Sequence, residues 1–273
     1  MLTKPLLLLL LVASAFISST FAEDRDKAVS RLQSAGTILD EIMAAPDKGL
    51  PEEILSGAQC VAIVPSMLKG GFLVGGSYGK GVATCRTTSG WSAPAFFRLE
   101  GGSFGLQIGG QAVDLIMVVM NESGMKHLLS SHFKLGADAS VAAGPVGRHA
   151  EGMTDLKMRA EVLTYSRARG VFAGVSVNGA GIQQDKGSTR AFYGRMLPFN
   201  AVLGGETPAP AEAHPFLGTV AKYAGGAKQP EKPAAAKPTA KPAEAQPAQP
   251  ASPQPATPQP EGKVTPEQPK PPL

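Results

Sequence analysis

The sequence predicts an α+β fold in one domain, built on a curved or barrel-like antiparallel sheet that is rich in glycine. Two observations carry this prediction. Strand-like apolar segments punctuated by glycine follow one another between residues 60 and 178, and helical patterns lie before and after them. Glycine inside a strand marks bends, bulges and close backbone packing, and helices packed on one side of such a sheet are typical of α+β folds.

Residues 1–22 have the pattern of an export signal. Lys4 precedes an apolar run at 6–12, and Thr20-Phe21-Ala22 offers small residues where a signal peptidase cleaves. Such a run is short for a membrane-spanning helix. We therefore expect an exported protein, periplasmic or secreted, with membrane association allowed; an uncleaved anchor is the alternative.

The segment Asp24–Ala45 has helical periodicity. Apolar side chains recur at three- and four-residue spacing through Val29, Leu32 and Leu39, and Pro46 ends the pattern. The sequence therefore predicts an N-terminal amphipathic helix, whose apolar stripe either packs on its own domain or lies on a membrane. A short second helix is expected with Pro51 at its first position.

Strand patterns fill the middle of the chain. Ala112–Asn121 is a continuous apolar run, which indicates a central strand buried on both faces. The other expected strands are 60–65, 69–86, 91–99, 104–109, 159–167 and 171–178. Short helices are expected at 122–131, 189–194 and 214–223.

Residues 224–273 read as a disordered tail. Fourteen of the 24 prolines lie between 230 and 272, mixed with Ala, Gln and Lys, and no aromatic residue is present. Such a composition cannot bury enough surface to fold, so the tail is either a spacer or inert. The folded domain then spans 24–223. Residues 23–223 hold 19 Lys or Arg and 18 Asp or Glu, which argues against a nucleic-acid partner.

Cys60 and Cys85 are the two cysteines. In an exported protein they form either a cross-strand disulfide or two buried free thiols. No spacing typical of a metal site is present, and no nucleotide-binding loop is recognisable. The sequence therefore predicts neither a metal nor a cofactor.

Two stretches match the G-x-S-x-G pattern of serine hydrolases, centred on Ser77 and Ser103. That chemistry needs a turn from a strand into a helix at the serine, and neither serine is followed by a helical pattern. No catalytic residue is assigned, an enzyme is not expected, and a serine hydrolase is a remote alternative.

Basic residues near glycine-rich turns are the candidates for binding phosphate. Gly-rich backbone and neighbouring basic side chains can hold an anionic headgroup through N–H groups and guanidinium contacts. The alternative is that these residues form internal ion pairs. The candidates are Lys69, Lys80, Arg148, Arg167 and Arg169.

Six blocks of the sequence resemble, in order, the blocks of the SYLF domain family. They lie at 70–82, 89–97, 113–121, 135–151, 164–182 and 192–194, and the similarity covers about 60–200. The resemblance implies a lipid-binding module, whose eukaryotic members bind phosphoinositide-containing membranes and in some cases actin.

With an export signal in front of it, this module is expected to be a non-catalytic protein that recognises anionic phospholipid or phosphoinositide-type headgroups at a membrane surface. Actin is not an expected partner in that setting. The alternative is a scaffold protein of the cell envelope that binds protein or cell-wall partners through its sheet or tail.

Overall fold

The computed structural model describes residues 3–45, 49–72, 74–104, 109–130, 132–146, 160–168, 171–175 and 177–225. All of them belong to one compact unit, Met1–Gln229. Two of the candidate phosphate ligands, Arg148 and Arg169, lie outside the described residues, as does most of the expected tail. No helix in the described part of the chain is both long and apolar enough to span a membrane.

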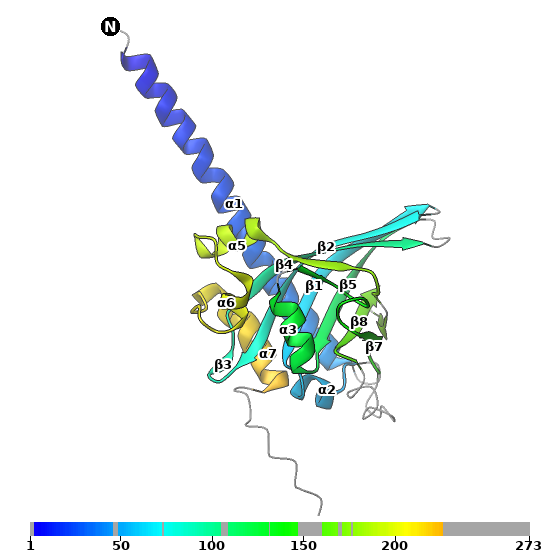
Figure 1. The fold of residues 1–273 in the computed structure, drawn as a ribbon. Coiled ribbons are helices and arrows are strands. Elements are labelled where there is room, and N and C mark those ends of the chain that lie inside the picture. Colours follow the sequence, from blue (N-terminus) through cyan, green and yellow to red (C-terminus); the bar gives the residue numbers. More distant parts are fainter. Residues whose placement is uncertain are drawn as a thin grey trace, which may run out of the picture. The chain divides into compact units, whose positions relative to one another are not determined.

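A strongly curled half-barrel sheet forms the centre of the unit (Figure 1), as the glycine-rich strands predict. In the described residues its order is β6-β10-β4-β2-β1-β5-β8-β7, with β3 beside β2 and β9 beside β8. Neighbours are antiparallel except β7 and β8. The strands are β1 (Cys60–Phe72), β2 (Val74–Thr87), β3 (Gly90–Trp91), β4 (Ala95–Phe104), β5 (Gly109–Val119), β6 (His132–Lys134), β7 (Val141–Ala143), β8 (Val162–Ala168), β9 (Val171–Gly174) and β10 (Gly181–Gln184).

Helices cover both faces of this sheet. The first face packs against α1 (Thr3–Ala44), α2 (Glu52–Ser56), α5 (Lys186–Tyr193) and α7 (His214–Ala224), which follows the short helix η1 (Ala211–Ala213). The second face packs against α3 (Glu122–Leu129) and α6 (Phe199–Leu203). Alternate residues serve the two cores: Val61 and Ile63 point to the first face, and Ala62 and Val64 to the second.

The long helix α1 differs from the expected helix in one respect. It begins at Thr3 rather than Asp24 and ends at Ala44. Its apolar stripe is buried, because Leu32, Leu39 and Ile42 are at most 1% exposed in the core of the first face. The stripe therefore packs on its own domain and is not available to a membrane. Pro51 is the N-cap of α2, not its first helical residue.

Several strand boundaries differ from the expected ones. The segment 69–86 is divided between β1 and β2, which form a hairpin. The segment 171–178 holds only the short strand β9, and β10 follows it as a separate strand. The short strands β6 and β7 lie in segments where apolar and polar residues do not alternate clearly, which is why the sequence did not predict them.

A bulge divides β1 into two parts. The register slips between Val64 and Met67, and Ser66 has a positive φ of 49°. The backbone N–H of Ser66 donates to Asp114 Oδ1 at 2.9 Å, so a side chain of β5 holds the bulge in place. Beyond the bulge, β1 continues with β2 past the helices (Figure 1).

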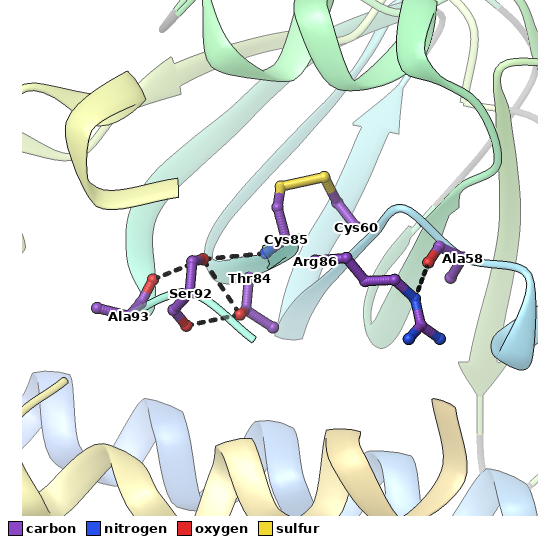
Figure 2. The surroundings of a disulfide bond; sticks show 7 residues. All are labelled: Ala58, Cys60, Thr84, Cys85, Arg86, Ser92 and Ala93. Atoms are coloured by element: carbon purple, nitrogen blue, oxygen red, sulfur yellow. Dashed lines mark hydrogen bonds between the residues drawn. A yellow bond between two sulfur atoms is a disulfide. The ribbon is translucent and has the colours of Figure 1, made fainter. Parts of the chain in front are cut away.

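The opposite end of β1 is held by a covalent link (Figure 2). Cys60 and Cys85 face each other across β1 and β2 and are joined as a disulfide. Arg86 follows Cys85; its guanidinium donates to the carbonyl oxygens of Ala58, at 2.7 Å, and of Ala224. Through the disulfide and Arg86, this end of β2 is therefore tied to β1, to the residues just before it and to the end of α7.

Candidate functional site

A row of polar side chains crosses four strands on the first face of the sheet. Strand register aligns His132 of β6 with Gln183 of β10, Gln183 with Arg98 of β4, and Arg98 with Lys80 of β2. Residues in register lie on the same face, and Arg98 Nη2 donates to Gln183 Oε1 at 2.7 Å. We call His132, Gln183, Arg98 and Lys80 the cationic row.

The next row of residues on this face, two positions closer to the β1–β2 hairpin, is partly apolar. It pairs Leu68 of β1 with Tyr78 of β2, which are 59% and 45% exposed. Exposed apolar side chains of this size that lie side by side mark contact surfaces more often than single ones do. In full, this mixed row consists of Lys134, Gly181, Glu100, Tyr78, Leu68 and Ala112.

Asp185 lies behind the cationic row. It is 5% exposed and caps α5 by accepting the Ser188 N–H at 3.1 Å. Lys80 Nζ lies 3.0 Å from Asp185 Oδ2, and Arg31 of α1 lies 4.0 Å from the same oxygen. Burial raises the pKa of the Asp185 carboxyl, but the hydrogen bonds from Ser188 and Lys80 outweigh burial and hold that pKa below its usual range.

A cavity of about 380 Å³ opens beside the cationic row. Arg98 and Lys186 bring positive charge to its wall, and His132 also lines it. The remaining lining residues are Gln183, Gln184, Asp185 and Gly187. Asp185 is paired with Lys80, and Arg98 Nε lies 3.1 Å from Glu100 Oε1. The remaining positive charge at this cavity comes from Lys186, and it suits an anionic group such as a phosphate.

Arg167 lies elsewhere on the first face, and its guanidinium is engaged in ion pairs within the protein. Its Nη2 lies 2.6 Å from Asp114 Oδ2, its Nη1 contacts the Glu41 carboxylate of α1, and its guanidinium lies over the ring of Phe172. The internal ion pair that the sequence left open as an alternative is thus present at Arg167. It joins α1 to β5 at the bulge.

Lys69 lies on the second face, one residue beyond Leu68, because neighbouring strand residues point to opposite faces. Burial lowers the pKa of its ammonium group. The structure therefore does not bring Lys69, Lys80 and Arg167 into one cluster. Their role in headgroup binding stays a prediction, as does that of Arg148 and Arg169.

The two G-x-S-x-G serines lie within strands. Ser77 is in β2, where its hydroxyl donates to the Gly101 carbonyl oxygen at 3.4 Å, and Ser103 is in β4. Ser77 therefore does not stand at the turn from a strand into a helix that a nucleophilic serine of this type needs, and Ser103 is paired with Gly75 within the β2–β4 ladder.

Sequence reasoning did not select Arg98, His132, Lys134 or Lys186. These residues come from three elements, β4, β6 and α5. Strand register through β10 relates β4 to β6, and Lys186 joins them at the wall of the cavity. The sequence offered one signal for such residues, the alternation of polar and apolar side chains within a strand. In β4, Arg98 and Glu100 alternate with Phe97 and Leu99. This identifies the polar face of β4 but not the residues of other strands that lie beside it.

A protein-family model described as "Ysc84: Las17-binding protein actin regulator" matches residues 100–223. This range runs from the middle of β4 to the end of α7, so it includes part of both rows.

Curated relatives are also similar to this chain. "SH3 domain-containing YSC84-like protein 1" of Homo sapiens is 36% identical over 170 residues, which cover 62% of this chain and 49% of the relative. Its Xenopus laevis counterpart is 34% identical over 200 residues, with 72% and 59% covered. "Protein YSC84" of Saccharomyces cerevisiae is 34% identical over 175 residues, with 63% and 37% covered.

The chain thus spans about half the length of most of these relatives. The match to the family model and the identity over 170 or more residues agree with the order of the sequence blocks. The chain belongs to the SYLF, or Ysc84-like, domain family.

Proposed function

We propose that this protein is a non-catalytic binding protein that associates with the surface of anionic phospholipid membranes. One observation carries the proposal: the exposed pair Leu68 and Tyr78 lies in the row next to the cationic row, on the same face of the sheet. An apolar contact next to fixed positive charge matches a bilayer surface, where anionic headgroups lie above acyl chains.

The expected energetics are modest and salt-dependent. Each Lys or Arg near an anionic surface contributes about 1 kcal/mol, and the effect falls off within a Debye length of roughly 8 Å at physiological salt. Lys134 and Lys186 are placed to contribute, and Arg98 contributes in part, because Glu100 lies 3.1 Å from its guanidinium and offsets its charge. Lys80 contributes less, because Asp185 already neutralises it.

Export is part of the proposal. The signal-like residues 1–22 support it, and so does the disulfide between Cys60 and Cys85, because disulfides persist in oxidising compartments such as the periplasm and the cell exterior.

A role in binding a protein partner is the second candidate. It is supported by the description of the family model, which names Las17 binding and actin regulation, and by a yeast relative called "LAS seventeen-binding protein 3". For this chain, that role corresponds to a scaffold in the cell envelope.

Vesicle co-sedimentation tests the proposal. Protein purified after expression of the complete chain, with its N-terminus sequenced, is mixed with neutral phosphatidylcholine vesicles and with vesicles containing phosphatidylglycerol or a phosphoinositide. We expect recovery with the anionic vesicles and its loss at high salt. Recovery near background with every vesicle type would overturn the proposal.

A matched pair of variants localises the binding. Arg98→Gln with Lys134→Gln removes two charges from the two rows, whereas Lys126→Gln with Arg195→Gln removes two exposed charges elsewhere. At about 1 kcal/mol per charge, the first variant should bind about thirtyfold more weakly. The second should stay within about twofold of the wild type.

A further inference from the structure

We propose that the outer ends of β1, β2, β4 and β5 form an arm that enters the lipid to the depth of the headgroup region. The arm comprises residues 69–72, 74–78, 101–104 and 109–112. This inference rests on the proposed function and adds to it the element that inserts and the depth that it reaches.

A row of four glycines crosses the arm. Strand register pairs Gly102 with Gly76, Gly76 with Gly70 and Gly70 with Gly110, so the row spans β4, β2, β1 and β5. It lies on the same face as Leu68 and Tyr78, two residues farther along, and all four glycines are exposed. The apolar pair therefore borders an open strip of bare backbone.

Packing within the protein does not require three of these glycines, Gly76, Gly102 and Gly110. A Cβ atom added at Gly102 or Gly110 would meet nothing within 4 Å, and one at Gly76 would meet only the Gly101 oxygen, at 3.8 Å. By contrast, a Cβ at Gly79 would come within 2.4 Å of Val64. Since glycine weakens a strand by roughly 0.5–1 kcal/mol relative to alanine, the open row needs a reason outside the fold.

The arm also carries no Asp, Glu, Lys or Arg beyond its base. The sequence has none from Gly70 to Gly79 and none from residue 101 to 113. Lys69, Lys80, Glu100 and Asp114 stand at the boundaries of these two stretches. Charged side chains are strongly disfavoured in the apolar part of a bilayer, so a neutral end with charges at its base matches a lipid surface.

Tyr78 stands at the boundary between the charged and the uncharged parts. Tyrosine is enriched where membrane meets water, because its ring is apolar and its hydroxyl is polar. The order of the rows is therefore cationic, then tyrosine with leucine, then bare backbone. The uncharged glycine row is thus the part that lies deepest, and the cationic row stays at the outer edge of the headgroups.

Backbone hydrogen bonding limits the depth. Among the described strands, β4 pairs with β10 only as far as Glu100, and β5 pairs with β8 only as far as Asp114. Beyond these residues each outer strand has one edge without a sheet neighbour, and unpaired peptide groups are costly in hydrocarbon.

The arm is long enough to reach that depth. Four residues separate Leu68 from Phe72, which corresponds to roughly 13 Å of strand. The headgroup region of one leaflet is roughly 5–8 Å thick. The arm is thus long enough to cross the headgroup region, and the cost of unpaired peptide groups in hydrocarbon keeps it from going deeper.

Depth-dependent fluorescence quenching tests this inference. The chain has a single tryptophan, Trp91, at the opposite end of β2 from the arm. Tyr78→Trp is combined with Trp91→Phe, and anionic phosphatidylglycerol vesicles carry lipids brominated at defined depths on the acyl chain. We expect a blue shift and quenching that is strongest with bromine near the headgroup. Trp91 of the wild-type protein should not be quenched.

Charge placed on the glycine row gives a second measurement. Gly102→Glu with Gly110→Glu adds carboxylates where the structure has room for them, and should weaken binding to anionic vesicles by tenfold or more. Gly218→Glu is the matched control, because Gly218 is exposed in α7 and an added Cβ there also meets nothing within 4 Å. It should leave binding within about twofold of the wild type, and melting curves should show every variant folded.

The outcomes separate the two proposals. If the wild type binds anionic vesicles but Tyr78→Trp is not quenched, the arm does not insert, while the proposed function stands. If the wild type binds no vesicle, both proposals fall. If the two glutamates change the oligomeric state but not the vesicle affinity, the glycine row contacts a second copy of the chain and the inference is wrong.

Discussion

Asp185→Asn should lower stability and raise membrane affinity together. Asparagine is as good an N-cap as aspartate, so the start of α5 is retained while the negative charge is lost. Arg31, whose side chain is 13% exposed, and Lys80, at 41%, then have no countercharge at this position. The substitution therefore isolates the electrostatic role of Asp185.

The magnitudes follow from the exposure of the two cations. A hydrogen bond to a charged group contributes about 1.5–3 kcal/mol when sheltered, whereas an exposed ion pair contributes about 0–1 kcal/mol. We expect the free energy of unfolding to fall by about 2–4 kcal/mol, which lowers the Tm by about 4–16 °C for a domain of this size. One more unit of positive charge beside the cationic row should tighten binding to anionic vesicles about fivefold.

The pH dependence has a definite sign. The folded-state pKa of Asp185 is held below its ordinary value, so the carboxylate stabilises the fold above its unfolded pKa of about 3.9. That contribution is lost as the pH falls through the folded pKa. The difference in Tm between the wild type and Asp185→Asn should therefore be full at pH 6 and should narrow below about pH 4.

Urea unfolding followed by circular dichroism and vesicle sedimentation at 20 °C measure both effects. Asp26→Asn, at an exposed position of α1, is the control and should change neither. Wild-type stability in Asp185→Asn would refute the role of the ion pairs. Lower stability with unchanged vesicle affinity would refute the link between Asp185 and the charge of the site.

Two further substitutions and the reduction of the disulfide test the fold around the site. Leu32→Ala should cost about 2–5 kcal/mol in urea unfolding with no change in vesicle affinity; weaker vesicle binding at wild-type stability would place the α1 stripe on the membrane. Reducing the disulfide between Cys60 and Cys85, which are 25 residues apart, should cost about 3.5 kcal/mol, measured as a lower Tm in dithiothreitol, and the double alanine variant should not respond to the reductant. Arg167→Ala should lose about 1.5–3 kcal/mol through its ion pairs and keep its vesicle affinity; the reverse result would restore Arg167 as a headgroup contact.

Much of the fold follows from local periodicity. The three- and four-residue spacing around Leu32 and Leu39 marks the helical face that α1 buries, and the apolar run 112–121 marks the central strand β5. Each pattern depends only on which residues of a single helix or strand are buried, so it can be read without knowing the rest of the fold. The start of α1 was not predicted, because an export-signal pattern and a helix share the same apolar composition.

The candidate site depends on information that is not local. The cationic row joins residues 80, 98, 132 and 183, and a register shift of one residue would move any of them to the other face. The same limit applies to Arg167: its sequence neighbourhood does not show that Glu41 and Asp114 lie within reach. Basic residues could be recognised as candidates, but their partners could not.

Two hydrogen bonds fix the end of α7 and Gly225 at one end of the domain. Trp91 Nε1 donates to the Gly225 carbonyl oxygen at 2.6 Å, and Arg86 binds that of Ala224, beside the disulfide end of β1. The arm lies at the other end of β1, roughly 40 Å away for a strand of 13 residues. With the arm in a bilayer, the chain leaves the domain at its far pole. Gly225, the last described residue of the unit, is then held on the side of the domain that faces away from the membrane.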